Sequence, residues 1–189
     1  MGHRVVEIFV VVSSREVLAG MRTARLFTMR GGDGEDLGDF DHVGEFHRRD
    51  EFGIENLALI LESLPGVSVI VTGGTVRPLQ HSLVAPMGTL LLDQLKADVA
   101  FLGCNGVDPT RGFTNTNIAE AEIKQAMVRS ATKTVFLADH DKIGQVASAF
   151  VADISGADLL ITDDGAEASV LSNLEGDGLS IEVVRLRGI

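Results

Sequence analysis

From Asn56 to the end of the chain, short runs of apolar and β-branched residues alternate with segments of helical periodicity. The runs expected to form strands are residues 67–72, 98–103, 134–139, 157–163 and 179–186. The segments expected to form helices are residues 87–96, 119–131, 145–151 and 166–175. Strands that alternate with helices of this length predict an α/β fold with a mostly parallel, Rossmann-like sheet and flanking helices.

Four of the predicted strands run into glycine, polar or charged residues. These strand ends are residues 72–74, 103–106, 139–142 and 162–164. The carboxyl ends of parallel strands meet at one edge of the sheet, and ligands of open α/β sheets bind just beyond that edge. We therefore expect the functional site to be built from these loops.

The first 54 residues differ from the remainder. Residues 5–12 form an apolar run that we expect to be a buried strand and not a signal peptide, because it is short and no small-residue cleavage site follows it. Residues 31–53 are dense in Gly, Asp, Glu, Phe and His without a sustained helical or strand period. The sequence therefore predicts an atypical N-terminal segment over residues 1–54, without a recognisable DNA-binding domain, and one α/β domain over residues 55–189.

Composition excludes several classes of protein. The formal net charge of -11 disfavours binding of nucleic acid or an anionic membrane surface by this chain alone. A single cysteine excludes an internal disulfide framework and a thiolate zinc site. No apolar run reaches the roughly 18 residues of a membrane span, so we expect a cytoplasmic protein. The spacing of His3, His42, His47 and His81 does not suit a metal site, and no metal or cofactor is predicted.

Seven short motifs stand in the predicted α/β domain. They occupy residues 71–74, 82–84 with Gly88, 98–106, 112–114, 119–127, 137–144 and 158–163. Each motif alone has little specificity. Together, their order and spacing resemble the C-terminal effector-sensing domain of the DeoR/GlpR family of bacterial transcriptional regulators.

This resemblance implies a fold and a function. The family's sensor shares its α/β fold with ribose-5-phosphate isomerase, glucosamine-6-phosphate deaminase and the CoA-transferase-like proteins. It binds a phosphorylated sugar or a related metabolite without a cofactor, and its regulators usually form homo-oligomers. Effector binding tunes an N-terminal winged helix-turn-helix domain on its DNA operator.

The sequence also departs from the family pattern. Nothing in residues 1–54 resembles a winged helix-turn-helix, or the family's Asp-x-Gly-Thr-Thr loop that cradles phosphate with backbone N–H groups. We therefore expect a truncated effector-binding domain that does not bind DNA by itself. Two explanations are open: residues 1–54 come from a wrong reading frame or misassigned start, or the N-terminus is natural and divergent.

Three charged residues are predicted to contact the effector. Lys124 lies on a strong predicted helix and Lys142 follows a strand end, and each would offer a cation to a phosphate. The alternatives are a solvated surface lysine at 124 and, at 142, a turn lysine paired with Asp139 or Asp141. Asp139 would accept a sugar hydroxyl, or would instead cap the following turn.

Two glycine loops complete the predicted ligand site. Gly73 and Gly74 would let the backbone turn tightly and approach a ligand closely, although a plain turn has the same requirement. Gly103, Asn105 and Gly106 would form a second such loop. There, Asn105 either hydrogen-bonds the sugar or simply tolerates a left-handed turn.

An enzyme of the same fold, a sugar-phosphate isomerase or deaminase, is the alternative function. In ribose-5-phosphate isomerase an Asp-Gly-Ala-Asp loop and a glutamate carry the acid–base chemistry. This sequence aligns Leu102 and Asn105 with the two aspartates and Ile123 with the glutamate, and none of these side chains is a useful base. Cys104 is expected to be a small buried residue. We therefore predict no catalytic residue and a non-enzymatic domain.

Overall fold

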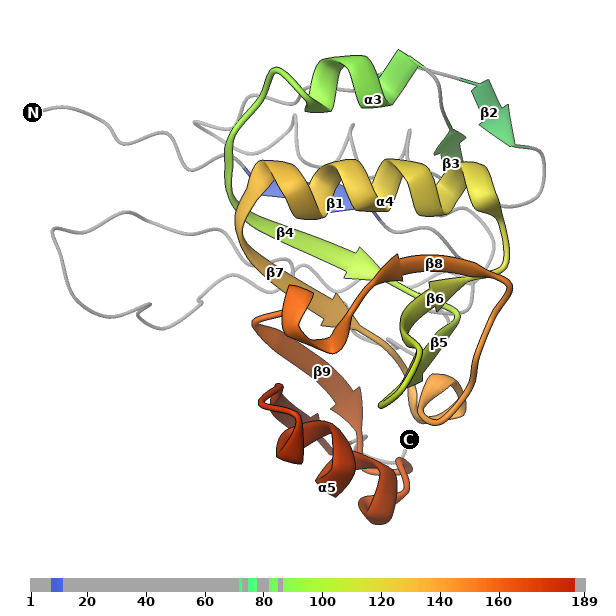
Figure 1. Ribbon diagram of the computed structural model, residues 1–189, viewed down its shortest axis with the longest axis vertical. Coiled ribbons are helices and arrows are strands. Elements are labelled where there is room, and N and C mark those ends of the chain that lie inside the picture. The colour runs from blue at the N-terminus through green and yellow to red at the C-terminus, as the bar shows by residue number, and fades with distance from the viewer. Residues whose placement is uncertain (1–7, 12–71, 73–74, 78–81, 85–86, 186–189) are drawn as a thin grey trace, which may run out of the picture.

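The computed structural model describes residues 8–11, 72, 75–77, 82–84 and 87–185, and within them five strands form one parallel sheet (Figure 1). The strand order is β1-β4-β7-β9-β10. The bounds are β1 Ile8–Val11, β4 Ala97–Gly103, β7 Ala131–Leu137, β9 Leu159–Asp163 and β10 Ser180–Val184. The predicted parallel α/β fold is confirmed, whereas residues 67–71 and most of the N-terminal segment lie outside the described residues.

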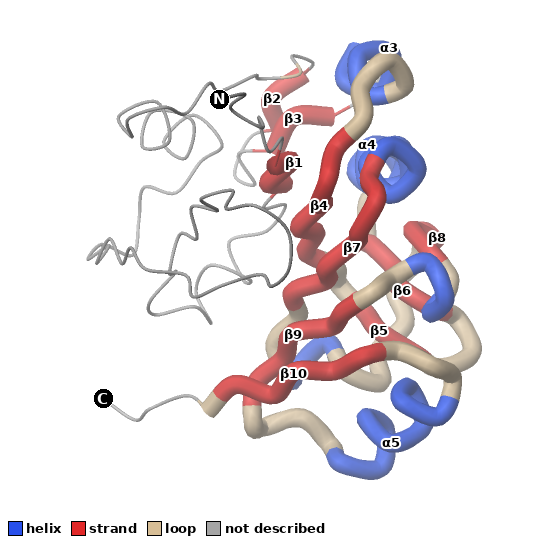
Figure 2. Tube along the Cα trace, turned by 90° about the vertical axis from the view of Figure 1, so that its left-hand side faces the viewer, coloured by secondary structure: helices blue, strands red, loops and turns tan. Residues whose placement is uncertain are grey.

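The described α-helices lie on the same side of this sheet (Figure 2). They are α3 (Met87–Leu92), α4 (Ile118–Ser130) and α5 (Ala168–Gly176). Neighbouring strands of the sheet follow one another in chain order. Because parallel crossovers are right-handed, successive crossovers that advance in one direction place their connections on one face. None of the described helices is long and apolar enough to cross a bilayer.

Two small antiparallel sheets accompany the main one. The first pairs β2 (Thr75–Arg77) with β3 (Ser82–Val84), and the second contains β5 (Gly106–Asp108), β6 (Gly112–Asn115) and β8 (Ala149–Ala152). The turn between β5 and β6 is closed by the Asp108 carboxylate, which accepts hydrogen bonds from the backbone N–H groups of Thr110 and Arg111. Gly112 then adopts a φ of 68°, a conformation that favours glycine.

The helix predicted over residues 145–151 is wrong. Residues 145–148 form a loop, and Ala149–Ala152 is strand β8, which pairs with β6. Burial alternates at the start of this strand, with Ala149 buried, Phe150 exposed and Val151 buried, as expected for a half-buried strand. A distant pairing partner therefore overrides the weak helical pattern. The helix predicted over residues 87–96 also ends earlier, at Leu92.

Helix α4 is the element for which local sequence gives the strongest signals. The Asn117 side chain caps its N-terminus by accepting a hydrogen bond from the Glu120 backbone N–H at 3.0 Å. Glu120 lies in the first turn and Arg129 in the last, in the order that the helix dipole favours. At Ala131 the backbone becomes extended and continues directly as β7.

The core lies between the main sheet and the elements on its helical side. Its largest fully buried apolar side chains are Phe113, Phe136, Leu92, Leu102, Met127, Leu160 and Leu174. Phe113 of β6 stacks on Phe136 of β7, with ring centroids 3.8 Å apart and planes inclined by 10°. This pair joins the small β5-β6-β8 sheet to the main sheet, and so holds the β5–β6 hairpin against the carboxyl ends of the strands.

Candidate functional site

The structure places most of the predicted site residues at the carboxyl edge of the main sheet. Gly103 ends β4, Asp139 follows β7, and Lys142 ends the 3-10 helix η1 (His140–Lys142) that comes next. Lys124 projects from α4, which packs against β4 and β7. Gly73 and Gly74 lie outside the described residues, so their role stays a prediction.

Lys124 is fully buried and forms part of a polar network. Its Nζ donates a 2.8 Å hydrogen bond to Asn115 Oδ1. The Asn115 amide in turn donates a 2.8 Å hydrogen bond to Glu120 Oε2. Asn115 is fully buried and Glu120 is 5% exposed. The expected alternative of a solvated lysine is therefore wrong, because the ammonium group is held inside the protein by residues of β6 and α4.

Electrostatics connect Lys124 with the other site residues. Burial lowers the pKa of Lys124 to about 8, against the attraction of Cys104 and Glu120. Burial also raises the pKa of the Cys104 thiol to about 12, and the charges of Lys124, Asp139 and Lys142 act on that thiol. The charges of these three predicted residues thus all influence Cys104, which is itself 1% exposed, as expected for a small buried residue.

These two shifts predict an unusual alkaline stability profile. The folded protein releases the Lys124 proton near pH 8 and the unfolded chain near 10.5, so the free energy of unfolding rises with pH in between. Cys104 has the opposite effect between pH 9.0 and about 12, because in this range only the unfolded chain loses the thiol proton. We expect the free energy of unfolding to rise by about 1 kcal/mol from pH 8 to 9, to stay level to about pH 10.5, and then to fall.

Urea denaturation at each pH measures this profile. The sequence contains no tyrosine, which leaves few other groups titrating in this range. Cys104→Ala is expected to remove the plateau and the decline while the initial rise persists. A steady loss of stability from pH 8 upward would contradict the assignment of a depressed pKa to Lys124.

Asp139 and Lys142 form a second charged pair at the same edge. Asp139 Oδ1 lies 3.8 Å from Lys142 Nζ, and both side chains are more than four-fifths buried. Burial raises the pKa of the Asp139 carboxyl, and the Lys142 charge partly offsets this effect. The Oδ1 atom is buried and has no hydrogen-bond partner. Of the alternatives left open above, the Lys142 ion pair is present, and no side-chain cap from Asp139 to the following turn is formed.

The loop after β4 is held to the small sheet. Asn105 Oδ1 accepts hydrogen bonds from the Thr116 backbone N–H at 3.0 Å and from its hydroxyl at 3.3 Å. The side-chain oxygen of Asn105 is thus occupied by Thr116, and the side-chain amide nitrogen is the part suited to a ligand. Gly106 has no room for a side chain, because a Cβ there would lie 2.5 Å from the Gln145 carbonyl oxygen. Close packing explains this glycine.

Sequence reasoning missed an interaction between the ends of β7 and β9. Asp163 accepts hydrogen bonds from the backbone N–H groups of His140 and Gly165 at 2.8 and 2.9 Å. His140 Nδ1 lies 2.7 Å from Asp163 Oδ1. Burial opposes ionisation of Asp163, but these hydrogen bonds and the nearby imidazole outweigh it and lower the pKa of the carboxyl. This contact fixes the start of η1, and thereby the segment that carries Lys142.

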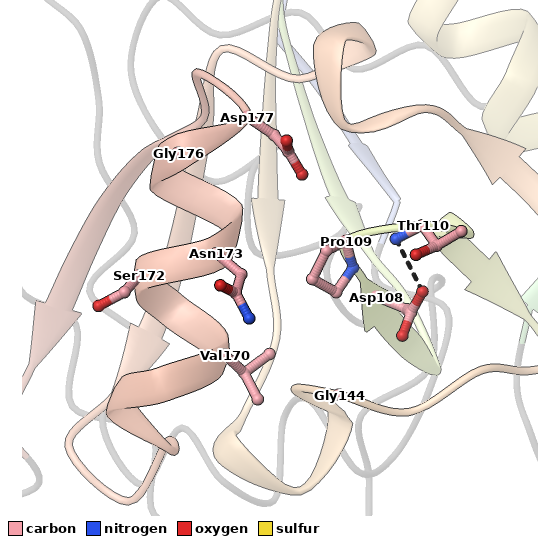
Figure 3. Close-up of a pocket in the computed structure, with 9 residues that line it drawn as sticks. All are labelled: Asp108, Pro109, Thr110, Gly144, Val170, Ser172, Asn173, Gly176 and Asp177. Carbon is pink, nitrogen blue, oxygen red and sulfur yellow. Dashed lines mark hydrogen bonds between the residues drawn. The ribbon is translucent and has the colours of Figure 1, made fainter.

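A separate hollow of about 730 Å³ lies between the β5–β6 turn and α5 (Figure 3). Its lining residues are Asp108, Pro109, Thr110, Gly144, Val170, Ser172, Asn173, Gly176 and Asp177. The lining includes two carboxylates and no lysine or arginine, so it does not suit a phosphate. None of the predicted site residues lines this hollow. Across the described ranges, no three His, Cys, Asp or Glu side chains gather as a metal site would require.

Comparison with known proteins decides the family. The family model for the DeoR C-terminal sensor domain matches residues 55–164. The chain belongs to this family. This DeoR-type sensor is 32% identical over 126 residues to the HTH-type transcriptional regulator GolR of Listeria innocua, covering 67% of this chain and 50% of that protein.

Other curated relatives of the DeoR-type sensor are also regulators. It is 34% identical over 113 residues to the HTH-type transcriptional regulator GlpR of Haloferax volcanii, covering 60% of this chain and 44% of the relative. It is 24% identical over 115 residues to the glycerol-3-phosphate regulon repressor of Haemophilus influenzae, covering 61% and 45%. The chain thus spans about half the length of the curated relatives it matches, and the DeoR/GlpR resemblance inferred from the seven motifs is confirmed.

Proposed function

We propose that this DeoR-type sensor binds a phosphorylated sugar or polyol at the carboxyl ends of β4 and β7. The observation that carries the proposal is the charged pair of Asp139 and Lys142 beyond the end of β7, with Asp139 Oδ1 3.8 Å from Lys142 Nζ. The partly exposed Lys142 ammonium group suits a phosphate, and Asp139 Oδ1 is a buried acceptor without a hydrogen-bond partner. The name of the Haemophilus relative, which refers to glycerol 3-phosphate, supports the same ligand class.

We further propose that the domain is a sensor without catalytic activity. The positions aligned with the acid–base groups of ribose-5-phosphate isomerase hold Leu102, Asn105 and Ile123. Leu102 and Ile123 are buried apolar side chains, and the Asn105 oxygen is bonded to Thr116. The regulator names of the relatives agree with this interpretation. A turnover assay with ribose 5-phosphate and glucosamine 6-phosphate tests it, and product formation would contradict it.

The assembly and the DNA-binding role are proposals for the whole regulator. We propose that residues 55–189 form the sensor of a cytoplasmic homo-oligomer with the isomerase-like fold that the resemblance implies. In such a regulator, effector binding would tune a winged helix-turn-helix on its operator. No such pattern is recognisable in residues 1–54 and the chain is acidic, so we propose that these 189 residues do not bind the operator by themselves.

Lys142→Ala tests the effector site most directly. Lys142 is partly exposed, whereas Lys124 is fully buried. Substitution of Lys142 therefore disturbs the stability of the fold less than substitution of Lys124. Thermal denaturation would be followed with glycerol 3-phosphate, ribose 5-phosphate and glucosamine 6-phosphate. A ligand at 100 times its dissociation constant adds about 2.7 kcal/mol to the wild-type stability.

We expect Lys142→Ala to weaken the binding of the responding ligand about ten- to a hundredfold, the effect of losing a charge-assisted hydrogen bond. The matched control is Lys133→Ala, which removes an exposed lysine of β7 away from the strand end. Equal affinity in Lys142→Ala and wild type would show that this lysine does not hold the phosphate.

A further inference from the structure

A buried threonine lies at the carboxyl edge of the sheet and has no role in the effector site proposed above. Thr162 is the penultimate residue of β9 and is 2% exposed. Its Oγ1 is buried and has no hydrogen-bond partner. Hydroxyl groups lose favourable interactions with water on burial, so nearly all buried ones are hydrogen-bonded, and an exception needs a reason.

Strand register places Thr162 beside the proposed effector site. Gly103, Leu137 and Ile161 face one another across β4, β7 and β9. The residues that follow them are Cys104, Ala138 and Thr162, which are 1%, 4% and 2% exposed. Neighbouring strands are about 4.8 Å apart. A short polyol phosphate therefore has the length to span the ends of β4, β7 and β9.

The polar neighbours of Thr162 interact with groups other than its hydroxyl. Asp163, the next residue, accepts hydrogen bonds from the backbone of His140 and Gly165. At the end of β7, Asp139 Oδ1 is the other buried atom without a hydrogen-bond partner, and the charge of Asp163 acts on its carboxyl. Two buried oxygens without a hydrogen-bond partner thus lie at the ends of adjacent strands, the Asp139 oxygen an acceptor and the Thr162 hydroxyl both donor and acceptor.

We propose that the Thr162 hydroxyl is a specificity-determining group that hydrogen-bonds a hydroxyl of the effector, beside Asp139 and away from the phosphate. This assignment rests on the proposed function. A neutral, buried hydroxyl suits a sugar hydroxyl far better than a dianion, whose desolvation it would not offset. Lys142 then holds the phosphate, while Thr162 distinguishes a polyol phosphate from a phosphate that bears an apolar chain.

Thr162→Val removes the hydroxyl at nearly constant volume and tests the proposal without ligand. Loss of an unpartnered buried hydroxyl is expected to leave the melting temperature unchanged or raise it by about 2–4 °C. The matched variant is Thr114→Val, because the buried Thr114 hydroxyl accepts from the Ala147 N–H and donates to the Gly106 carbonyl. That variant is expected to lower the melting temperature. An equal loss in Thr162→Val would overturn the proposal.

Binding is then measured with glycerol 3-phosphate and with propyl phosphate, which lacks the hydroxyls. Wild type is expected to prefer glycerol 3-phosphate. Thr162→Val should weaken glycerol 3-phosphate about five- to tenfold and leave propyl phosphate unchanged, and Thr162→Ser should retain the preference.

The outcomes separate this assignment from the proposed function. Wild type that binds both phosphates equally, or a Thr162→Val variant that keeps the preference, overturns the hydroxyl assignment alone. Wild type that binds neither probe, nor any of the sugar phosphates tested with Lys142→Ala, overturns the proposed function and this assignment with it.

Discussion

Lys124→Met is expected to destabilise the folded protein by about 3–5 kcal/mol, the usual cost of leaving a buried charge without its compensating charge. The substitution leaves Asn115 Oδ1 without its donor, and it leaves the Glu120 carboxylate buried without the nearby positive charge. Urea denaturation at pH 7 measures the loss, since Lys124 is still mostly protonated there. Lys133→Met, at an exposed position of β7, is the control and should stay within about 0.5 kcal/mol of wild type.

A double variant separates the charge effect from packing. Lys124→Met combined with Glu120→Gln removes both charges, and replacing a whole buried pair is often close to neutral. We therefore expect the double variant to recover most of the stability lost in the single one. If Glu120→Gln adds a further loss of its own, the two groups act independently, and the two charges do not compensate each other in this network.

The second large effect is expected from Phe136→Ala. Phe136 is fully buried and stacks on Phe113, so the substitution removes a large core side chain and the contact between the two sheets. Truncation of a buried phenylalanine costs about 3–5 kcal/mol. Phe150→Ala, in β8 of the small sheet, is the control: Phe150 is 49% exposed and should cost much less.

Unfolding by urea, followed by circular dichroism, compares the two phenylalanine variants. Because Phe113 lies in the same small sheet as the β5–β6 hairpin, Phe136→Ala should also weaken effector binding through the loop that contains Asn105. Similar losses in both variants would mean that the stacked pair is not the principal attachment of the small sheet.

The elements with strong local signals could be predicted from the sequence. Helix α4 has a capping Asn117, an acidic first turn and a basic last turn, and all of these act within a few residues. The β-branched and apolar runs of β4, β7 and β9 likewise predict strands from the local sequence alone. Strand β8 could not be predicted, because a short apolar segment fits either period and its partner β6 lies more than thirty residues away.

The common location of the candidate residues was predictable, but their contacts were not. Glycine and polar residues at strand ends predicted that they lie at one edge, because sheet geometry alone brings such ends together. The burial of Lys124 depends on Asn115, which comes from another element, although the spacing of Glu120 and Lys124 by four residues was a usable signal. The contact between His140 and Asp163 joins the ends of neighbouring strands and leaves no pattern in the sequence.

The one-directional winding of the sheet limits how this domain can be shortened in the laboratory. Since α3, α4 and α5 all lie on one side, residues 87–185 provide no helix for the opposite side (Figure 2). Val99 and Val135 are nonetheless buried, and neither belongs to the core cluster formed with those helices. A recombinant fragment cut to residues 87–185 would lose β1, which pairs with β4, so the edge of β4 would be open to pairing with another copy. Aggregation, not a smaller working sensor, is what such a truncation should yield.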